Sequence, residues 1–170
     1  ERSSARETTM RVALSCICRK LIEELGVSLC SHVTAIKNIE SSFRFETFNE
    51  SASVLNDNAD NSLVRCLDLD AESKMIQAID SAKKNGDSVG GQFEIIATGL
   101  PYGIGSHIQW DTKLHSRIAS SIMSVNAFKG MEIGLGFESG ARLGSEVHDE
   151  IGWDGKKYTR FSNNAGGIEG

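Results

Sequence analysis

The sequence predicts an α+β layered fold, and three observations point to this class. Helical and strand patterns alternate along the chain, in the order helix, strand, helix, strand, helix, strand and hairpin. The helical stretches carry apolar residues at spacings of three and four, whereas the strand stretches alternate. The chain has 170 residues, 39% hydrophobic and 24% charged, which suffices for one core. We therefore expect residues 1–170 to form a single domain.

The first helix is predicted over residues 4–25 and a strand over residues 27–36. The apolar stripe of the helix consists of Met10, Leu14, Ile17, Leu21 and Leu25. Gly26 supplies the stop after the helix. The apolar face of the strand consists of Val27, Leu29, Val33 and Ala35. His32 falls on the opposite face, where we expect an ordinary surface residue.

Residues 38–70 give the weakest structural signal. The stretch NESASVLNDNADNS is polar and rich in Asn, so we expect a loop or a poorly ordered insertion. A second helix is predicted over residues 70–84, with Asp70 as its N-cap and two lysines before Gly86. Its apolar side consists of Met75, Ile76 and Ile79. Residues 89–99 follow as a strand whose inward-facing residues are Phe93, Ile95 and Ala97.

The last third of the chain is punctuated by glycine. The segment GLPYGIGSHIQWD predicts a loop over residues 99–111, after which a third helix begins at Asp111 or Thr112. The buried stripe expected for this helix is Leu114, Ile118, Ile122 and Val125. The segment KGMEIGLGFESG predicts a short strand and a turn, and HDEIGWDGKKYTRF a hairpin around Asp154-Gly155. The chain closes in SNNAGGIEG, and we expect both ends to continue in a longer protein.

Charge and composition exclude several classes of protein. A net charge of −5 disfavours a nucleic-acid binder, which would carry a strongly basic face. The sequence has no run of about 18 apolar residues, so no membrane helix is predicted, and no signal segment is visible. The four cysteines are Cys16, Cys18, Cys30 and Cys66. They form no C-x-x-C pair, so we expect buried or semi-buried free thiols in a reducing cytoplasm, and no metal site.

The segment RSSARET, residues 2–8, is a candidate binding motif. Ser4 and Glu7 have the spacing of a capping box, in which each side chain accepts the other residue's backbone N–H. The box does not account for Arg2 and Arg6, because the helix dipole disfavours arginine in the first turn. Two guanidinium groups beside unpaired N–H groups would form a site for phosphate or carboxylate. From these residues alone, a surface accident and a phosphate site both stay open.

Glycine clusters are the second candidate feature, because glycine lets a backbone approach a ligand closely. They are Gly103 and Gly105, then Gly134 and Gly136, then Gly166, Gly167 and Gly170. None fits a dinucleotide or phosphate-loop pattern. Asn126-Ala127 closes the third helix, and Asn163-Asn164 fits either a turn or an amide that grips a planar ring. Asp149 and Glu150 are adjacent, and no sequence rule makes them a general acid–base pair.

Four segments, taken together, resemble the chorismate synthase family in order and spacing. They are ERSSARETTMRVA, GLPYGIGSHIQWDTKLHSRIASSIMSVNAFKGMEIGLGFESG, GSEVHDEI and NNAGGIEG. The resemblance covers residues 1–37 and about 70–170 and is weak across residues 38–70. It implies a layered β-α-β sandwich, of which this chain would be a central portion.

The resemblance implies a lyase that converts 5-enolpyruvylshikimate 3-phosphate to chorismate and phosphate, the last step of the shikimate pathway. This anti-1,4-elimination requires reduced FMN with no net redox change. The implied enzyme is a cytoplasmic homotetramer with no nucleic-acid or membrane partner; whether NADPH-linked activity of its own reduces the flavin stays open. The residues matching flavin contacts are Arg2, Ser3, Ser4, Asn126, Ala127 and Gly170. Those matching substrate contacts are Ser4, Ala5 and Arg6.

The family's two proton-transfer histidines have no counterpart in this chain. Its own histidines, which match neither position, are His32, His107, His115 and His148. We therefore expect no catalytic residue here, no activity from the isolated 170 residues, and weak or absent FMN binding. Two other readings stay open: a non-catalytic domain that binds a phosphorylated ligand at a capped helix, and an assembly module whose glycine loops are mere turns.

Overall fold

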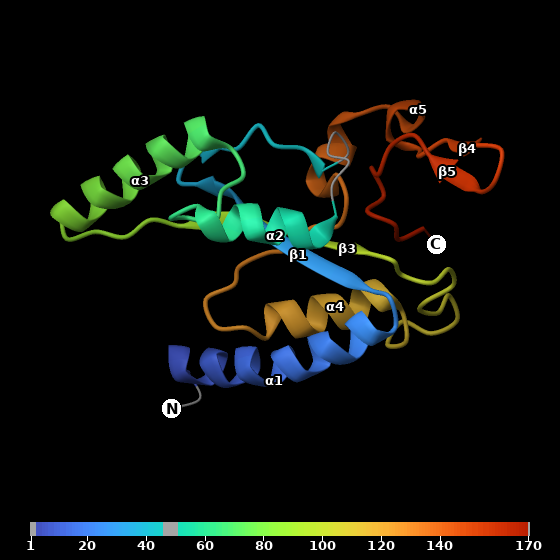
Figure 1. Cartoon of the computed structure of the whole chain (residues 1–170), viewed down its shortest axis with the longest axis horizontal. Coiled ribbons are helices and arrows are strands. Elements are labelled where there is room, and N and C mark those ends of the chain that lie inside the picture. Colours follow the sequence, from blue (N-terminus) through green and yellow to red (C-terminus); the bar gives the residue numbers. More distant parts are fainter. Residues whose placement is uncertain (1–2, 46–50, 170) are drawn as a thin grey trace. The chain divides into compact units, whose positions relative to one another are not determined.

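The computed structural model describes residues 3–45 and 51–169 (Figure 1). The chain divides into two compact units. Unit 1 comprises Glu1–Ser15 and Pro101–Gly170, and unit 2 comprises Cys16–Leu100. Helix α1, Ala5–Glu24, contributes to both and matches its predicted bounds to within one residue. Each unit combines helices with antiparallel strands, which confirms the α+β class. That the units form one domain with a β-α-β sandwich stays a prediction.

Unit 2 is built on a three-stranded antiparallel sheet in the order β2-β1-β3. The strands are β1 Ser28–Ile36, β2 Ile39–Glu40 and β3 Gly91–Thr98. The two predicted strands are confirmed to within two residues at each end. Cys30 pairs with Ile96 and His32 with Glu94, and a bulge interrupts the register just after Val33.

Helix α2, Ala52–Asn61, occupies most of the predicted loop, so that prediction is wrong for these residues. Ser51 caps the helix, because its hydroxyl accepts a hydrogen bond from the Val54 N–H. The buried side of α2 consists of Ala52, Leu55 and Ala59, at spacings of three and four. This narrow apolar stripe lies among Asn and Asp residues. For that reason the sequence pattern did not predict a helix here.

The position of α2 decides which face of the sheet is buried, since α2 packs on β1 and β3. Cys30 packs against α2, and His32 on the same face is 2% exposed. The expectation of a surface histidine is therefore wrong. The residues predicted to face inward on β3, which are exposed instead, are Phe93, Ile95 and Ala97. The face predicted for β1 is half right, because Val27 and Ala35 are buried while Leu29 and Val33 are half-buried.

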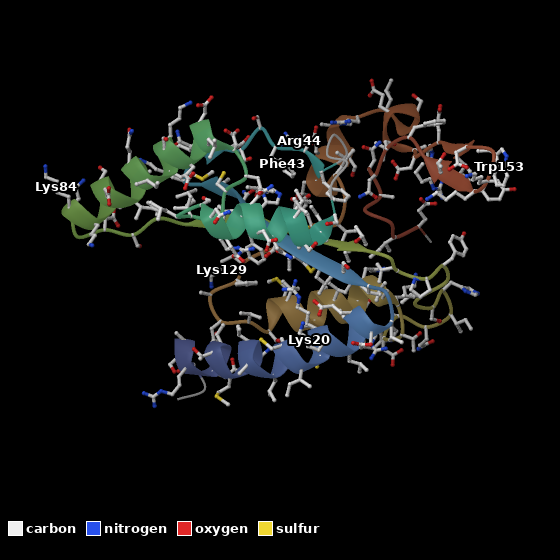
Figure 2. The ribbon with its side chains drawn as sticks, in the orientation of Figure 1. Lys20, Phe43, Arg44, Lys84, Lys129 and Trp153 are labelled. Carbon is white, nitrogen blue, oxygen red and sulfur yellow. The ribbon has the colours of Figure 1, made fainter. Side chains whose placement is uncertain are left out.

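Helix α3, Leu69–Lys84, is capped by Asp68 rather than by the predicted Asp70. The Asp68 carboxylate accepts the backbone N–H groups of Asp70 and Ala71. Met75 is fully buried in the core of unit 2, as its predicted place on the apolar side requires. Lys84 lies in the last turn at the far end of α3 (Figure 2). A positive charge there interacts favourably with the helix dipole.

All four cysteines are free thiols. Cys30 and Cys66 are buried as expected, whereas Cys16 and Cys18 are exposed. Burial, with the charge of Glu94 adding to it, raises the pKa of the Cys30 thiol and keeps it unreactive. Within residues 3–45 and 51–169, no group of three or more His, Cys, Asp or Glu side chains is placed to hold a metal ion. No helix of that described part has the length and apolar character needed to cross a bilayer.

Unit 1 contains α4 Leu114–Met123, the short helices η2 Gly136–Ala141 and α5 Gly144–Val147, and the hairpin of β4 Ile151–Trp153 with β5 Tyr158–Arg160. The hairpin prediction is confirmed, and Trp153 lies at this hairpin (Figure 2). The ring of Trp153 meets that of Tyr158 edge-on at 5.1 Å. The short strand predicted in KGMEIGLGFESG is wrong, because that segment forms turns and η2.

Among the described residues of unit 1, no side chain is buried. The predicted buried stripe of α4 is therefore wrong: Leu114, Ile122 and Val125 are half-buried and Ile118 is exposed. The apolar stripe of α1 is likewise exposed, from Met10 at 59% to Leu25 at 71%. Sequence periodicity identified the apolar residues on one face of each helix, but it did not predict how exposed that face is.

Candidate functional site

The predicted anion site lies where α1 begins. The Ser4 hydroxyl accepts the backbone N–H of Arg6 at 3.3 Å, and the Ser4 carbonyl accepts that of Glu7 at 3.0 Å. Ser4 therefore caps the helix, but its hydroxyl bonds one residue earlier than the capping box predicts. Residues 3–6 are all exposed, so the predicted substrate-contact residues, Ser4, Ala5 and Arg6, lie on an accessible surface.

The segment that follows α4 is joined to this helix start by two hydrogen bonds. Asn126 Nδ2 donates to the Ser4 carbonyl at 3.1 Å, and Arg11 Nη1 donates to the Ser124 hydroxyl at 2.6 Å. Asn126 and Ser4 are separated by 122 positions in the chain. The structure thus brings together two of the residues that match flavin contacts. Arg2 and Gly170, also predicted as flavin contacts, lie outside the described residues.

Ala127 has a left-handed backbone with φ of +71°, which is costly for a residue with a side chain. The expectation that Asn126-Ala127 closes α4 is corrected by the structure: α4 ends at Met123, with Ser124 as its C-cap. The strain at Ala127 therefore belongs to the turn beyond the helix. Ala127 is exposed beside the half-buried Asn126, which leaves this strained backbone accessible.

Glu7 is a candidate site residue that the sequence interpretation assigned only to helix capping. Its Oε1 accepts Arg11 Nε at 2.6 Å, in an ion pair one turn apart. Its Oε2 is buried and has no hydrogen-bond partner within the described part of the chain. An acceptor left without a donor costs free energy, so this oxygen would favour a bound hydroxyl or cation. In the sequence, the i, i+4 spacing of Glu7 and Arg11 was the signal that could have predicted this ion pair.

The glycine clusters have a structural explanation in one case. Leu135 N–H donates to the Asn164 carbonyl at 2.8 Å, which brings two loops together backbone to backbone. Gly134 and Gly166, at φ of +59° and +62°, lie at this contact, and a Cβ at Gly134 would overlap the Asn164 carbonyl. These two glycines therefore let the chain approach itself rather than a ligand.

His32 occupies a core environment in unit 2. Its Nε2 lies 3.0 Å from Glu94 Oε2, and its ring meets that of Phe43 edge-on at 4.9 Å. Its Nδ1 has no hydrogen-bond partner among the described atoms. His107 and His148 are exposed and His115 is half-buried. None of the four is placed in a Ser–His or Cys–His arrangement by the hydrogen bonds of the described residues.

Unit 2 also contains a polar cavity of about 460 Å³, bordered by Arg19, Arg65 and three acidic or amide side chains of α2. Both guanidinium groups are already paired. Arg19 binds Glu23 and the Leu29 carbonyl, and Arg65 binds Asp60 and the Ser31 carbonyl. Because both cations are neutralised within the protein, this cavity is a weak candidate for an anion site.

Comparison with known proteins identifies the family. The family model described as chorismate synthase matches residues 1–170, including the stretch 38–70 where the sequence resemblance was weak. Chorismate synthase 1 of Bacillus thuringiensis strain Al Hakam and chorismate synthase 2 of Bacillus anthracis are each 52% identical to this chain. Both alignments span the whole chain and 43% of the relative.

A solved structure supports the same conclusion. A crystal structure of chorismate synthase matches 99% of the chain with a TM-score of 0.90 and 44% sequence identity, and 52% of that protein is covered. The chain thus spans about half the length of the proteins that it matches. From the agreement of the family model, the curated relatives and the fold, we conclude that this chain belongs to the chorismate synthase family.

Proposed function

We propose that the protein containing this chain catalyses the elimination of phosphate from 5-enolpyruvylshikimate 3-phosphate to give chorismate, using reduced FMN. The observation that supports this most strongly is the family match over all 170 residues. The hydrogen bond between Ser4 and Asn126 adds geometric support, because these residues match two separate flavin-contact segments of the family. A non-catalytic phosphate-binding domain is not favoured by the family match.

The start of α1 would bind the anionic groups of the substrate. Backbone N–H groups of the first turn carry partial positive charge, and the exposed Arg6 adds a guanidinium group beside them. Negative charge builds on the phosphate as its bond to carbon breaks. A fixed guanidinium group stabilises that charge more in the transition state than in the bound substrate, and so accelerates the reaction.

The flavin would lie against Ser3, Ser4, Asn126 and Ala127, with Arg2 and Gly170 as further contacts. The buried Glu7 Oε2, which lacks a partner among the described residues, fits a cofactor that carries hydroxyl groups, because a hydroxyl can donate to a carboxylate. When bound, reduced FMN supplies the electron density that assists cleavage of the carbon–oxygen bond. Asn126 holds the helix start through the Ser4 carbonyl, so the chain's role there is to orient both ligands.

The family resemblance also supports a cytoplasmic homotetramer with no nucleic-acid or membrane partner. No proton-transfer residue is assigned within these 170 residues, since none of their histidines matches the family positions. We therefore expect the isolated chain to be inactive and to bind FMN weakly or not at all.

The proposal is tested by anaerobic turnover of 5-enolpyruvylshikimate 3-phosphate with chemically reduced FMN. The 170-residue chain is compared with the full open reading frame of its gene, and chorismate is measured directly. Chorismate from the longer form alone is the expected result. Chorismate from neither form would overturn the proposed activity, and chorismate from the short chain would overturn the expectation that it is inactive.

A further inference from the structure

The segment 124–127, which turns away from the end of α4, is attached to α1 at two points. Asn126 Nδ2 donates to the Ser4 carbonyl at 3.1 Å, at the start of the helix. From the second turn of α1, Arg11 Nη1 donates to the Ser124 hydroxyl at 2.6 Å. The two bonds join different residues on both sides, and they run in opposite directions. They therefore hold turn 124–127 at two points rather than at a single pivot.

Arg11 is itself held in place by its neighbours. Its Nε donates to Glu7 Oε1 at 2.6 Å, and because the guanidinium group is planar and rigid, this bond fixes the direction of Nη1. The Ser124 hydroxyl donates its proton to the Ser121 carbonyl at 2.7 Å, which leaves the hydroxyl oxygen as the acceptor for Arg11. Glu7, Arg11 and Ser124 thus form a directed chain of hydrogen bonds, which the charges of Glu7 and Arg11 strengthen.

Turn 124–127 is strained and needs such support. Ala127 has a left-handed backbone with φ of +71°, a conformation that persists only where surrounding contacts determine it. Within the turn, the Val125 N–H donates to the Ile122 carbonyl at 3.0 Å and the Phe128 N–H to the Val125 carbonyl at 3.3 Å. No apolar core fixes the turn, since no described residue of unit 1 is buried. The hydrogen bonds to α1 therefore determine where the turn lies relative to the helix start.

We propose that Arg11 is a positioning residue, which acts through Ser124 to hold turn 124–127 against the start of α1 in the geometry that binds the flavin. This inference rests on the proposed function, because it takes Ser4 and Asn126 as flavin contacts. The structure describes both of these residues and the hydrogen bond between them. Arg11 prepares this surface before the flavin arrives, which reduces the ordering that binding requires.

The test is Arg11→Lys in the full-length protein, because lysine keeps the positive charge but lacks the rigid fork that binds Glu7 and Ser124 together. We expect the dissociation constant of oxidised FMN, measured by quenching of its fluorescence in the presence of the phosphorylated substrate, to rise about tenfold. Without ligands, hydrogen exchange at the Val125 and Phe128 amides should accelerate by a similar factor. In turnover, the loss should appear in KM for the flavin rather than in kcat, because bound ligands hold the turn themselves.

Arg142→Lys is the matched control. Arg142 also forms an ion pair with a glutamate of the same unit, Glu138, but this pair joins residues only four positions apart. The FMN dissociation constant of the control should stay within about twofold of wild type, because an ion pair of this kind fixes no distant segment.

Ser124→Ala tests the other end of the contact. Ser124 is exposed, so this variant keeps the inference testable if Arg11→Lys does not fold. The FMN dissociation constant should rise about threefold. A protein with both substitutions should bind FMN about tenfold more weakly than wild type, rather than about thirtyfold, because both substitutions break the same contact.

The outcomes distinguish this inference from the proposed function. Wild-type protein that binds FMN, with Arg11→Lys and Arg142→Lys variants of equal affinity, would overturn the positioning role and leave the proposed function standing. A loss of about thirtyfold in the double variant would overturn the claim that Arg11 acts through Ser124. Weaker FMN binding without faster exchange at the Val125 and Phe128 amides would contradict the role of Arg11 in holding the turn. Wild-type protein that binds no FMN would overturn the proposed function and, with it, this inference.

Discussion

The two units of the chain are stabilised in different ways. Among the described residues, every buried side chain belongs to unit 2, where Leu55 and Met75 are 1% and 0% exposed. Unit 1 instead depends on hydrogen bonds, such as those from Arg11 to Ser124 and from the 162–165 segment to Asp149. All the described residues that match family ligand contacts lie in unit 1. Within this chain, the unit with the core is therefore not the unit with the candidate site.

The difference teaches how binding surfaces are built. Apolar burial stabilises without fixing direction, whereas hydrogen bonds fix the geometry of the groups that they join. Ser4 and Asn126 come from distant parts of the chain and meet through one such bond. A ligand that must be oriented benefits from polar, accessible surroundings of this kind, while unit 2 supplies stability.

The largest expected effect is the loss of a core side chain in unit 2. Met75→Ala should lower the free energy of unfolding by about 2–5 kcal/mol, because it leaves a cavity. The matched substitution Met10→Ala, at a side chain that is 59% exposed in α1, should cost less than about 0.5 kcal/mol. Equilibrium urea unfolding of the 170-residue chain measures both. Equal losses at the two positions would break the contrast between the units.

The sequence was sufficient where local rules decide the structure. The bounds of α1, both long strands and the hairpin at Asp154-Gly155 followed from periodicity, a stop glycine and turn chemistry. It failed where tertiary contacts decide, as in α2, whose short stripe Ala52, Leu55 and Ala59 is defined only by the sheet that it covers. The burial of His32 was missed for the same reason.

The candidate site was predicted in part. Its residue types and the match to the family were visible in RSSARET and in Asn126-Ala127. The contact between Ser4 and Asn126, the buried Glu7 oxygen and the bond from Arg11 to Ser124 were not, because each depends on atoms brought together by folding.

A smaller effect is expected at the cap of α3. Hydrogen bonds from the Ser42 hydroxyl and N–H, with those from Ala71 and Asp70, lower the pKa of Asp68 from 3.8 to about 2. A depressed pKa in the folded state means stability that is present above pH 3.8 and lost as the pH falls through about 2. Asp68→Asn should remove this pH dependence and cost about 1 kcal/mol at neutral pH.

Asp70→Asn, in the first turn of the same helix, is the control for that experiment. It should cost only a few tenths of a kcal/mol and keep the acid dependence, because Asp70 donates to the cap rather than forming it. Urea unfolding between pH 2 and pH 7 compares the two variants. A larger effect from Asp70 would restore the cap predicted from the sequence.

The smallest effect is expected at the Ser124 hydroxyl of unit 1, which accepts Arg11 Nη1 and also donates to the Ser121 carbonyl one turn before it. Ser124→Ala removes the acceptor of Arg11 Nη1 and should cost about 0.5–1 kcal/mol. Ser121→Ala on α4, whose hydroxyl bonds only the Arg117 carbonyl one turn before it, should cost less. A Ser124 variant as stable as the Ser121 variant, by urea unfolding, would show that this contact does not stabilise unit 1.

The most direct test of the account is the effect of Arg6→Ala on anaerobic chorismate formation by the full-length protein. Lys20→Ala, which removes a mostly exposed cation from the same helix, serves as the control. If the start of α1 binds the anionic substrate, the Arg6 variant should lose about 100-fold or more in kcat/KM while the control stays within about twofold of wild type. An Arg6 variant as active as wild type would contradict the placement of the substrate at this helix start.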